Sequence, residues 1–209
     1  ILQVLRSYIS ASKKIRFEGD NYSEEWAEEA KSRGLNNFKT TPEALDAFIT
    51  DSAKELFLSN NIFTKRELEA RHEIMLEDYV KRLQIEARIL GYMATNHILP
   101  AAVNYQNTLI ENIKGLKEIG LDASAYKAQL NLANVISRHI QSINDNVEAM
   151  IEARKRANNT EDMHKRAHMY CHEVKSYFDP IRYASDKLEL IVDDKLWPLP
   201  KFRELLYMR

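Results

Sequence analysis

The chain has 209 residues, of which 44% are hydrophobic and 29% charged, a mixture typical of a folded globular protein rather than a disordered one. The formal net charge of −1 lacks the basic excess of nucleic-acid-binding proteins, and no apolar stretch reaches the ~20 residues that span a bilayer, so neither nucleic acid nor a membrane is an expected partner. The single cysteine, Cys171, forms no internal disulfide and does not favour an oxidising compartment, and no signal peptide is visible.

The first predicted helix covers residues 1–14, where apolar residues recur at helical spacing. A second, shorter helix is predicted in "YSEEWAEEAKSR", with Asn21 and Glu24 as a capping box and Gly34 as its C-terminal stop. Trp26 is the expected anchor of this helix. The apolar residues of the first helix are Leu2, Leu5 and Ile9.

A third helix is predicted in "TTPEALDAFITDSAKELF", because Thr41 suits the N-cap and Pro42 the first helical position. Asn60 and Asn61 end it. Residues 1–60 are therefore predicted to form a small helical lobe, separate from residues 61–209. The apolar face of this third helix consists of Leu45, Phe48, Ile49, Ala53, Leu56 and Phe57.

The clearest helix start lies in "IFTKREL", where Thr64 and Glu67 form a capping box and Phe63 and Leu68 occupy the positions of a hydrophobic staple. The helical pattern continues to about His97. One face carries the apolar residues Leu76, Val80, Leu83, Ala87, Leu90 and Ala94.

Pro100 interrupts this pattern. Inside a helix it removes one hydrogen bond and clashes with the carbonyl of Asn96, at a cost of about 3 kcal/mol, so we expect a kink or break near residues 98–99. Helix then resumes and ends at Gly120.

Another long helix is predicted from Ala123 to about Ala157, with apolar residues alternating by threes and fours, which indicates packing against a nearly antiparallel neighbour. Further helices follow over 161–178 and from Asp179 onward. The predicted fold is all-α: a bundle of long antiparallel helices with a smaller N-terminal helical lobe. The seam of the long helix comprises Ala133, Ile136, Ile140, Ile143, Val147 and Met150.

The sequence contains no recognisable catalytic motif. Its five glycines are scattered, whereas a phosphate-binding loop needs several close together. No serine–histidine or cysteine–histidine arrangement stands out, and nearly all carboxylates fall on polar helix faces. We therefore assign no catalytic, cofactor-binding or metal-binding residue, and expect the chain alone to be inactive.

One histidine series leaves two interpretations open. His164, His168 and His172 recur every four residues beside Cys171, a spacing that can chelate zinc or nickel. The alternative is a histidine-rich helix surface, since neighbouring turns supply no further ligands.

Other polar residues have structural explanations. His72 and His97 border the apolar stripe and are expected to bond nearby carbonyls. Arg154, Lys155 and Arg156 lie near a helix C-terminus, where the dipole favours them, with an anion site as the alternative. Gly91, inside a helix, indicates close approach of another element.

Four stretches together resemble the C-terminal part of type III glutamine synthetases: "RFEGDNYSEEW", "KTTPEALDAF", "NHILPAAVNYQNTLIENIKGLKE" and "YFDPIRYASDKLELIVDDKLWPLPKFRELL". The resemblance runs along essentially the whole chain. It implies a cytoplasmic parent enzyme that joins ammonia to glutamate with ATP and magnesium or manganese, and that assembles as a large homo-oligomer.

The resemblance also implies that the catalytic residues and cofactor sites lie upstream of Ile1, because none of the family's catalytic motifs occurs here. Residues 1–60 then form the tail of the catalytic domain, and residues 61–209 a helical bundle whose partners are the rest of the parent chain and neighbouring subunits. The alternatives are a stand-alone helical interaction module and a metal-binding helical protein built on the histidine series.

The chain ends on an apolar segment, Trp197–Arg209, whose prolines Pro198 and Pro200 predict an extended backbone before each of them. A large exposed tryptophan favours aggregation, so we expect Trp197 to dock on the bundle, or else on another part of the parent chain or a neighbouring subunit.

Overall fold

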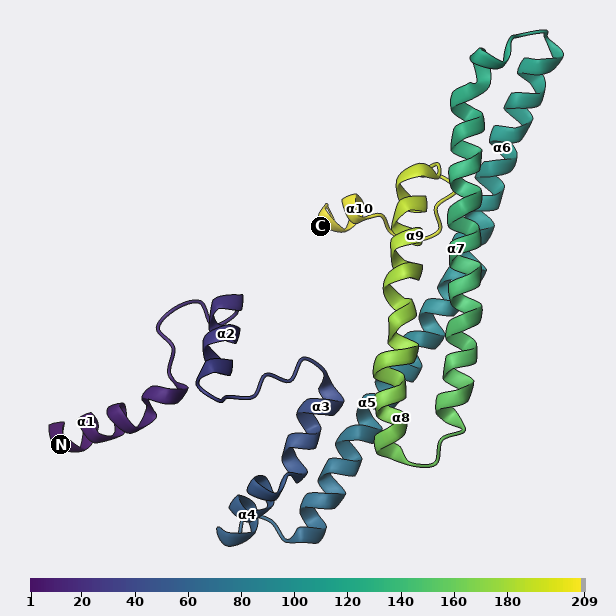
Figure 1. Ribbon diagram of the computed structural model, residues 1–209. Helices are drawn as coiled ribbons and strands as arrows, with labels where there is room; N and C mark the ends of the chain where they lie inside the picture. Colours follow the sequence, from purple (N-terminus) through teal and green to yellow (C-terminus); the bar gives the residue numbers. More distant parts are fainter. Residues whose placement is uncertain (208–209) are drawn as a thin grey trace.

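The computed structural model describes residues 1–207, and this part of the chain consists of helices and connecting turns without a β-strand (Figure 1). The predicted all-α class is confirmed. The α-helices are α1 (Leu2–Ala11), α2 (Glu24–Ser32), α3 (Thr41–Asp46), α4 (Asp51–Ser59), α5 (Lys65–Met93), α6 (Leu99–Glu118), α7 (Lys127–Asn158), α8 (Met163–Met169), α9 (Phe178–Ile191) and α10 (Phe202–Leu206).

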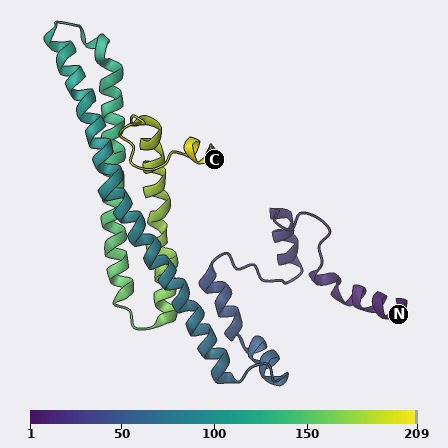
Figure 2. The same cartoon turned by 180° about the vertical axis from the view of Figure 1, so that it is seen from behind.

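Three long rods make up the bundle. Helices α5 and α6 form the first, α7 returns antiparallel beside α6, and α8 with α9 runs back along α5 and α7 (Figures 1 and 2). None of the helices within residues 1–207 combines the length and apolar character that a membrane crossing needs.

The interruption expected at Pro100 takes the form of a π-helical segment, Ala94–Ile98, and the rod does not break there. A π-helical turn skips one residue in the hydrogen-bond ladder, which accommodates the missing N–H of Pro100 and the bulk of its ring. A second π-helical segment, Tyr170–Val174, and a 3₁₀ turn, Lys175–Tyr177, likewise join α8 to α9.

The core lies where the apolar stripes of the rods meet. Every residue of the two predicted stripes is buried or partly buried against it, so the antiparallel seam is confirmed. The most completely buried large side chains include Leu76, Ile136, Ile143, Met150 and Tyr170.

Gly91 marks a close approach, as expected. A Cβ at this position would lie 3.4 Å from Cε of Met150 and 3.8 Å from Cγ1 of Val147. These are ordinary van der Waals distances, so alanine fits.

We expect Gly91→Ala to raise the free energy of unfolding by up to about 1 kcal/mol, because alanine is the better helix former and adds a buried methyl group. Gly91→Leu should instead lower it by about 1–3 kcal/mol through overpacking against Met150. Urea denaturation followed by circular dichroism measures both variants. Equal destabilisation by both would show that the rods approach more closely than the structure indicates.

The N-terminal helices differ from the predicted ones in their caps. The N-cap of α2 is Ser23, whose Oγ accepts from the backbone N–H of Trp26, and not Asn21. The N-cap of α3 is Thr40. The predicted third helix is two helices, α3 and α4, joined by a 3₁₀ turn over Ala47–Ile49. The extended Thr50 ends this turn, and its side chain caps α4 by accepting from the backbone N–H of Ala53.

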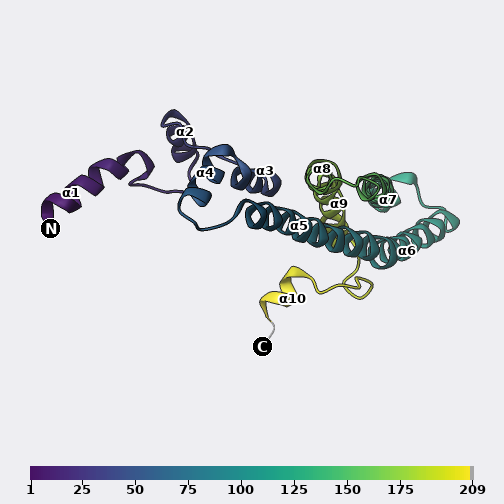
Figure 3. The same ribbon diagram turned by 90° about the horizontal axis from the view of Figure 1, so that it is seen from below.

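Helices α1 and α2 lie apart from the bundle, whereas α3 and α4 pack along the beginning of α5 (Figure 3). Trp26 of α2 stacks on Phe17, in the segment that follows α1, with ring centroids 4.7 Å apart. Arg33 donates to the backbone carbonyls of Lys13 and Arg16. The boundary near residue 60 stays a prediction; α4 and α5, on either side of it, contact each other.

The capping box of α5 forms as predicted. Oγ1 of Thr64 accepts from the backbone N–H of Glu67, whose carboxylate accepts from the backbone N–H of Thr64 at 2.8 Å. The hydrogen bonds from the Thr64 backbone and side chain hold the pKa of Glu67 below its usual value.

Thr64→Ala is expected to lower the free energy of unfolding by about 1 kcal/mol, because the first turn of α5 loses its side-chain acceptor. Thr108→Ala is the matched control, since Thr108 is exposed in the middle of α6 and its hydroxyl donates to the carbonyl of Asn104. Chemical denaturation compares the two, and an equal loss would show that the cap contributes nothing specific.

The C-terminal segment folds back on the bundle, as expected for its Trp–Pro part. Trp197 is only 8% exposed and joins the core. Nζ of Lys201 donates to the carbonyls of Glu189 (2.8 Å) and Val192 (3.2 Å) at the end of α9. Leu205, Leu206 and Tyr207 are exposed, and residues 208–209 of this segment lie outside the described part.

Candidate functional site

A cluster of three histidines around one carboxylate lies where α3, α5 and α8 meet. The Asp46 carboxylate, at the end of α3, accepts from Nε2 of His72 on α5 at 3.1 Å through its Oδ1 atom. Its Oδ2 atom lies 2.8 Å from Nε2 of His164 and 3.2 Å from Nε2 of His168, both on α8.

Three helices position this cluster. His164 and His168 are four residues apart and share one face of α8. His72 lies between Leu68 and Leu76 on the buried stripe of α5, four residues from each. Helix α3 packs against both α5 and α8, so its last residue meets both faces.

The electrostatics favour an ionised Asp46. Partial burial raises the pKa of its carboxyl, but the hydrogen bonds from His164, His168 and His72 lower it by more, and the net pKa lies below the usual value. The cluster is therefore a carboxylate surrounded by imidazole donors, and Asp46, His164 and His168 each offer a ligand atom within 4.8 Å of the others.

The structure corrects the interpretation of His72 and divides the histidine series. His72 is buried and pairs with a carboxylate from another helix, not with a nearby carbonyl. His172 does not reach Asp46; its ring stacks on that of His168 with centroids 5.8 Å apart. The further ligand atom that the neighbouring turns lack comes from Asp46 of α3, which sequence reasoning missed.

The other polar residues singled out from the sequence lie elsewhere. The ring of His97 meets the edge of Tyr92. Lys155 pairs with Glu152 at 2.6 Å and Arg156 with Glu173 at 3.1 Å, which agrees with a structural role. Beside Cys171, burial and then a hydrogen bond with that thiol raise the pKa of the Tyr79 hydroxyl well above its usual value.

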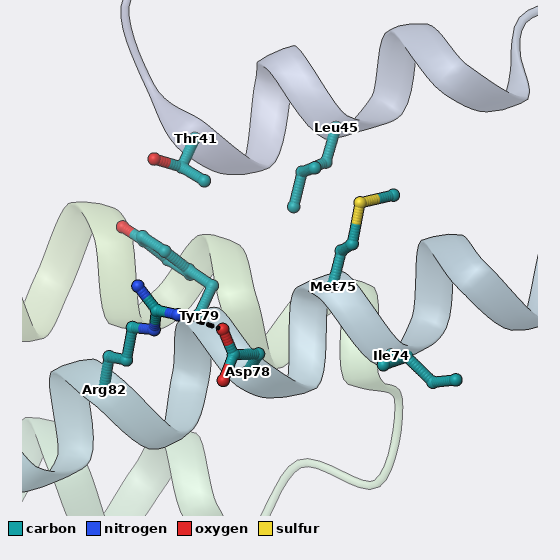
Figure 4. Close-up of a pocket in the computed structure, with 7 residues that line it drawn as sticks. All are labelled: Thr41, Leu45, Ile74, Met75, Asp78, Tyr79 and Arg82. Atoms are coloured by element: carbon teal, nitrogen blue, oxygen red, sulfur yellow. Dashed lines mark ion pairs between the residues drawn. The ribbon is translucent and has the colours of Figure 1, made fainter.

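A surface hollow of about 410 Å³ lies between α3 and α5 (Figure 4). Figure 4 shows Thr41 and Leu45 of α3 facing Met75 and Tyr79 of α5 across it. Its two charged residues, Asp78 and Arg82, are paired with each other at 2.8 Å. The hollow is mainly apolar and offers no converging set of unpaired polar groups.

Together these features define an all-helical bundle domain, with a carboxylate–histidine cluster where α3 joins the rods. Residues 1–117 match the family described as glutamine synthetase C-terminal domain. The chain belongs to this family, as the resemblance in its sequence indicated.

Alignments with individual glutamine synthetases extend this similarity to 99–100% of the chain. The chain is 43% identical to a glutamine synthetase of Bacteroides fragilis (strain YCH46) over 213 aligned residues, which cover 100% of this chain. It is 31% identical to a type-3 glutamine synthetase of Dictyostelium discoideum over 99% of the chain. It is 28% identical to a glutamine synthetase of Butyrivibrio fibrisolvens, also over 99%. The chain spans 29% of the length of each of these relatives.

Proposed function

We propose that this chain is the helical C-terminal region of a type III glutamine synthetase and serves the architecture and assembly of that enzyme. The observation that carries the proposal is the alignment of the whole chain with only 29% of each relative's length. The ligation of ammonia to glutamate, and the binding of ATP and magnesium or manganese, then belong to other parts of a cytoplasmic, homo-oligomeric parent.

Exposed apolar side chains support a role in assembly. Leu2, Leu5 and Ile9, on one face of α1, are 76%, 50% and 52% exposed. Ile85 and Ile89 of α5 are 58% and 52% exposed beside an apolar hollow between α5 and α9. Faces of this kind mark surfaces that other protein covers, here the rest of the parent or a neighbouring subunit.

The test is a pair of activity assays. The 209-residue chain should form no glutamine from glutamate, ammonia and ATP, while the full-length polypeptide containing it should do so. Glutamine formation by this chain alone would overturn the assignment. A reading frame that contains this chain and encodes no catalytic domain would instead favour the stand-alone interaction module.

We further expect Leu5→Asp combined with Ile9→Asp to reduce the oligomer size of the full-length polypeptide, because each places a charge on the apolar face of α1. Ile119→Asp, at the exposed end of α6, is the control and should leave the size unchanged. Light scattering coupled to size-exclusion chromatography measures this. An unchanged size for the α1 variant would remove α1 from the assembly surface.

A further inference from the structure

We propose that Asp46, His164 and His168 bind a divalent transition-metal ion of the zinc class, and that His72 positions the Asp46 carboxylate for it. This inference does not depend on the proposed function, because it rests on side chains of this chain alone.

The distances between ligand atoms suit such an ion. In a tetrahedral site with bonds of about 2.0–2.1 Å to nitrogen and oxygen, neighbouring ligand atoms lie roughly 3.3 Å apart. Oδ2 of Asp46 lies 2.8 Å and 3.2 Å from the two Nε2 atoms on α8. Small side-chain movements therefore open the site. The ion replaces two hydrogen bonds, and the neutral rings of His164 and His168 then carry their protons on Nδ1.

The ligand set selects the class of ion. Two imidazoles and a carboxylate suit zinc and similar transition metals, whereas magnesium and calcium prefer oxygen ligands. The His164 side chain is 49% exposed and that of Asp46 30% exposed, so the site borders solvent and leaves a coordination position for water.

A carboxylate that binds a metal usually also accepts a hydrogen bond from another residue, and here His72 is placed to donate it. Its Nε2 lies 3.1 Å from Oδ1 of Asp46, whereas the two histidines of α8 lie near Oδ2, and the His72 side chain is 10% exposed. A donor at this place holds the carboxylate plane so that Oδ2 points toward His164 and His168.

The site has a structural consequence, since its ligands come from distant parts of the chain. Asp46 and His164 are separated by 118 residues. A bound ion therefore cross-links the end of α3 to α8.

Isothermal titration calorimetry of the full chain with zinc chloride, after treatment with a chelator, tests the proposal. We expect one zinc ion per chain, and a loss of affinity of at least about 10-fold in Asp46→Asn and in His168→Ala. His172→Ala is the matched control, because His172 lies on the same rod but does not contact Asp46, and it should bind zinc like the parent chain.

His72 needs its own comparison. His72→Leu should weaken binding by roughly 10-fold or more, while His72→Gln, which keeps an N–H donor, should recover part of the loss. The visible absorption of bound cobalt should change in His72→Leu, because the carboxylate is no longer held in one orientation. Circular dichroism checks that each variant keeps its helical content, and His164→Ala, at the exposed edge, replaces any variant that does not fold.

Three results would overturn the proposal. One is the absence of specific heat when zinc is added to the parent chain. Another is full retention of binding in Asp46→Asn. The third is loss of binding in His172→Ala, which would assign the ion to the exposed histidine series alone.

Discussion

Trp197→Ala is expected to lower the free energy of unfolding by about 3–5 kcal/mol. The indole is buried in the core beyond the end of α9, and its removal leaves a cavity that Pro198 and Leu199 cannot fill without moving the chain. Nε1 of Trp197 has no hydrogen-bond partner among the described residues, so the loss comes from packing.

Trp197→Phe tests the packing explanation. Because it keeps most of the buried ring, it should cost much less than the alanine variant. Leu206→Ala, at a position 64% exposed in the same segment, is the control and should change stability by less than about 0.5 kcal/mol. Urea denaturation measures all three. Equal losses for the phenylalanine and alanine variants would contradict the packing explanation.

Ile136→Ala is the second large expected effect, with a loss of about 2–5 kcal/mol. Ile136 is 0% exposed on the seam of α7. Its neighbours belong to rigid rods that cannot close around a missing side chain, so the cavity should persist.

Ile119→Ala provides the matched control, since Ile119 is 72% exposed at the end of α6. Thermal and urea denaturation of the two variants should differ by several kcal/mol in unfolding free energy. A small effect of Ile136→Ala would show that the α7 seam is loosely packed.

Features that depend on a few neighbouring residues were predictable from the sequence. The capping box of Thr64 and Glu67 is complete within four residues, and the stripes of α5 and α7 follow from the period of the helix. Competition between two nearby capping residues explains the wrong N-cap prediction for α2. Both Asn21 and Ser23 are good N-caps, and only the backbone path shows that Ser23 is used.

The histidine–carboxylate cluster was not predictable in the same way. Asp46 is 26 residues from His72 and 118 from His164, and no periodicity connects them. The sequence offered two signals, the four-residue spacing of His164 and His168 and the position of His72 on an apolar stripe. Neither identified Asp46, because that partner depends on how α3 packs.

The π-helical segment Ala94–Ile98 keeps the first rod continuous across Pro100. A π-helical turn takes up one extra residue within its wider loop, so the helix before it and the helix after it keep a common axis. Before the segment the rod contacts α8, and after it α6 contacts α7. Removing one residue from this stretch would restore a regular α-helix, in which the ring of Pro100 meets the carbonyl four residues before it. The wider turn thus lets one continuous rod contain a proline and still pack against two different helices.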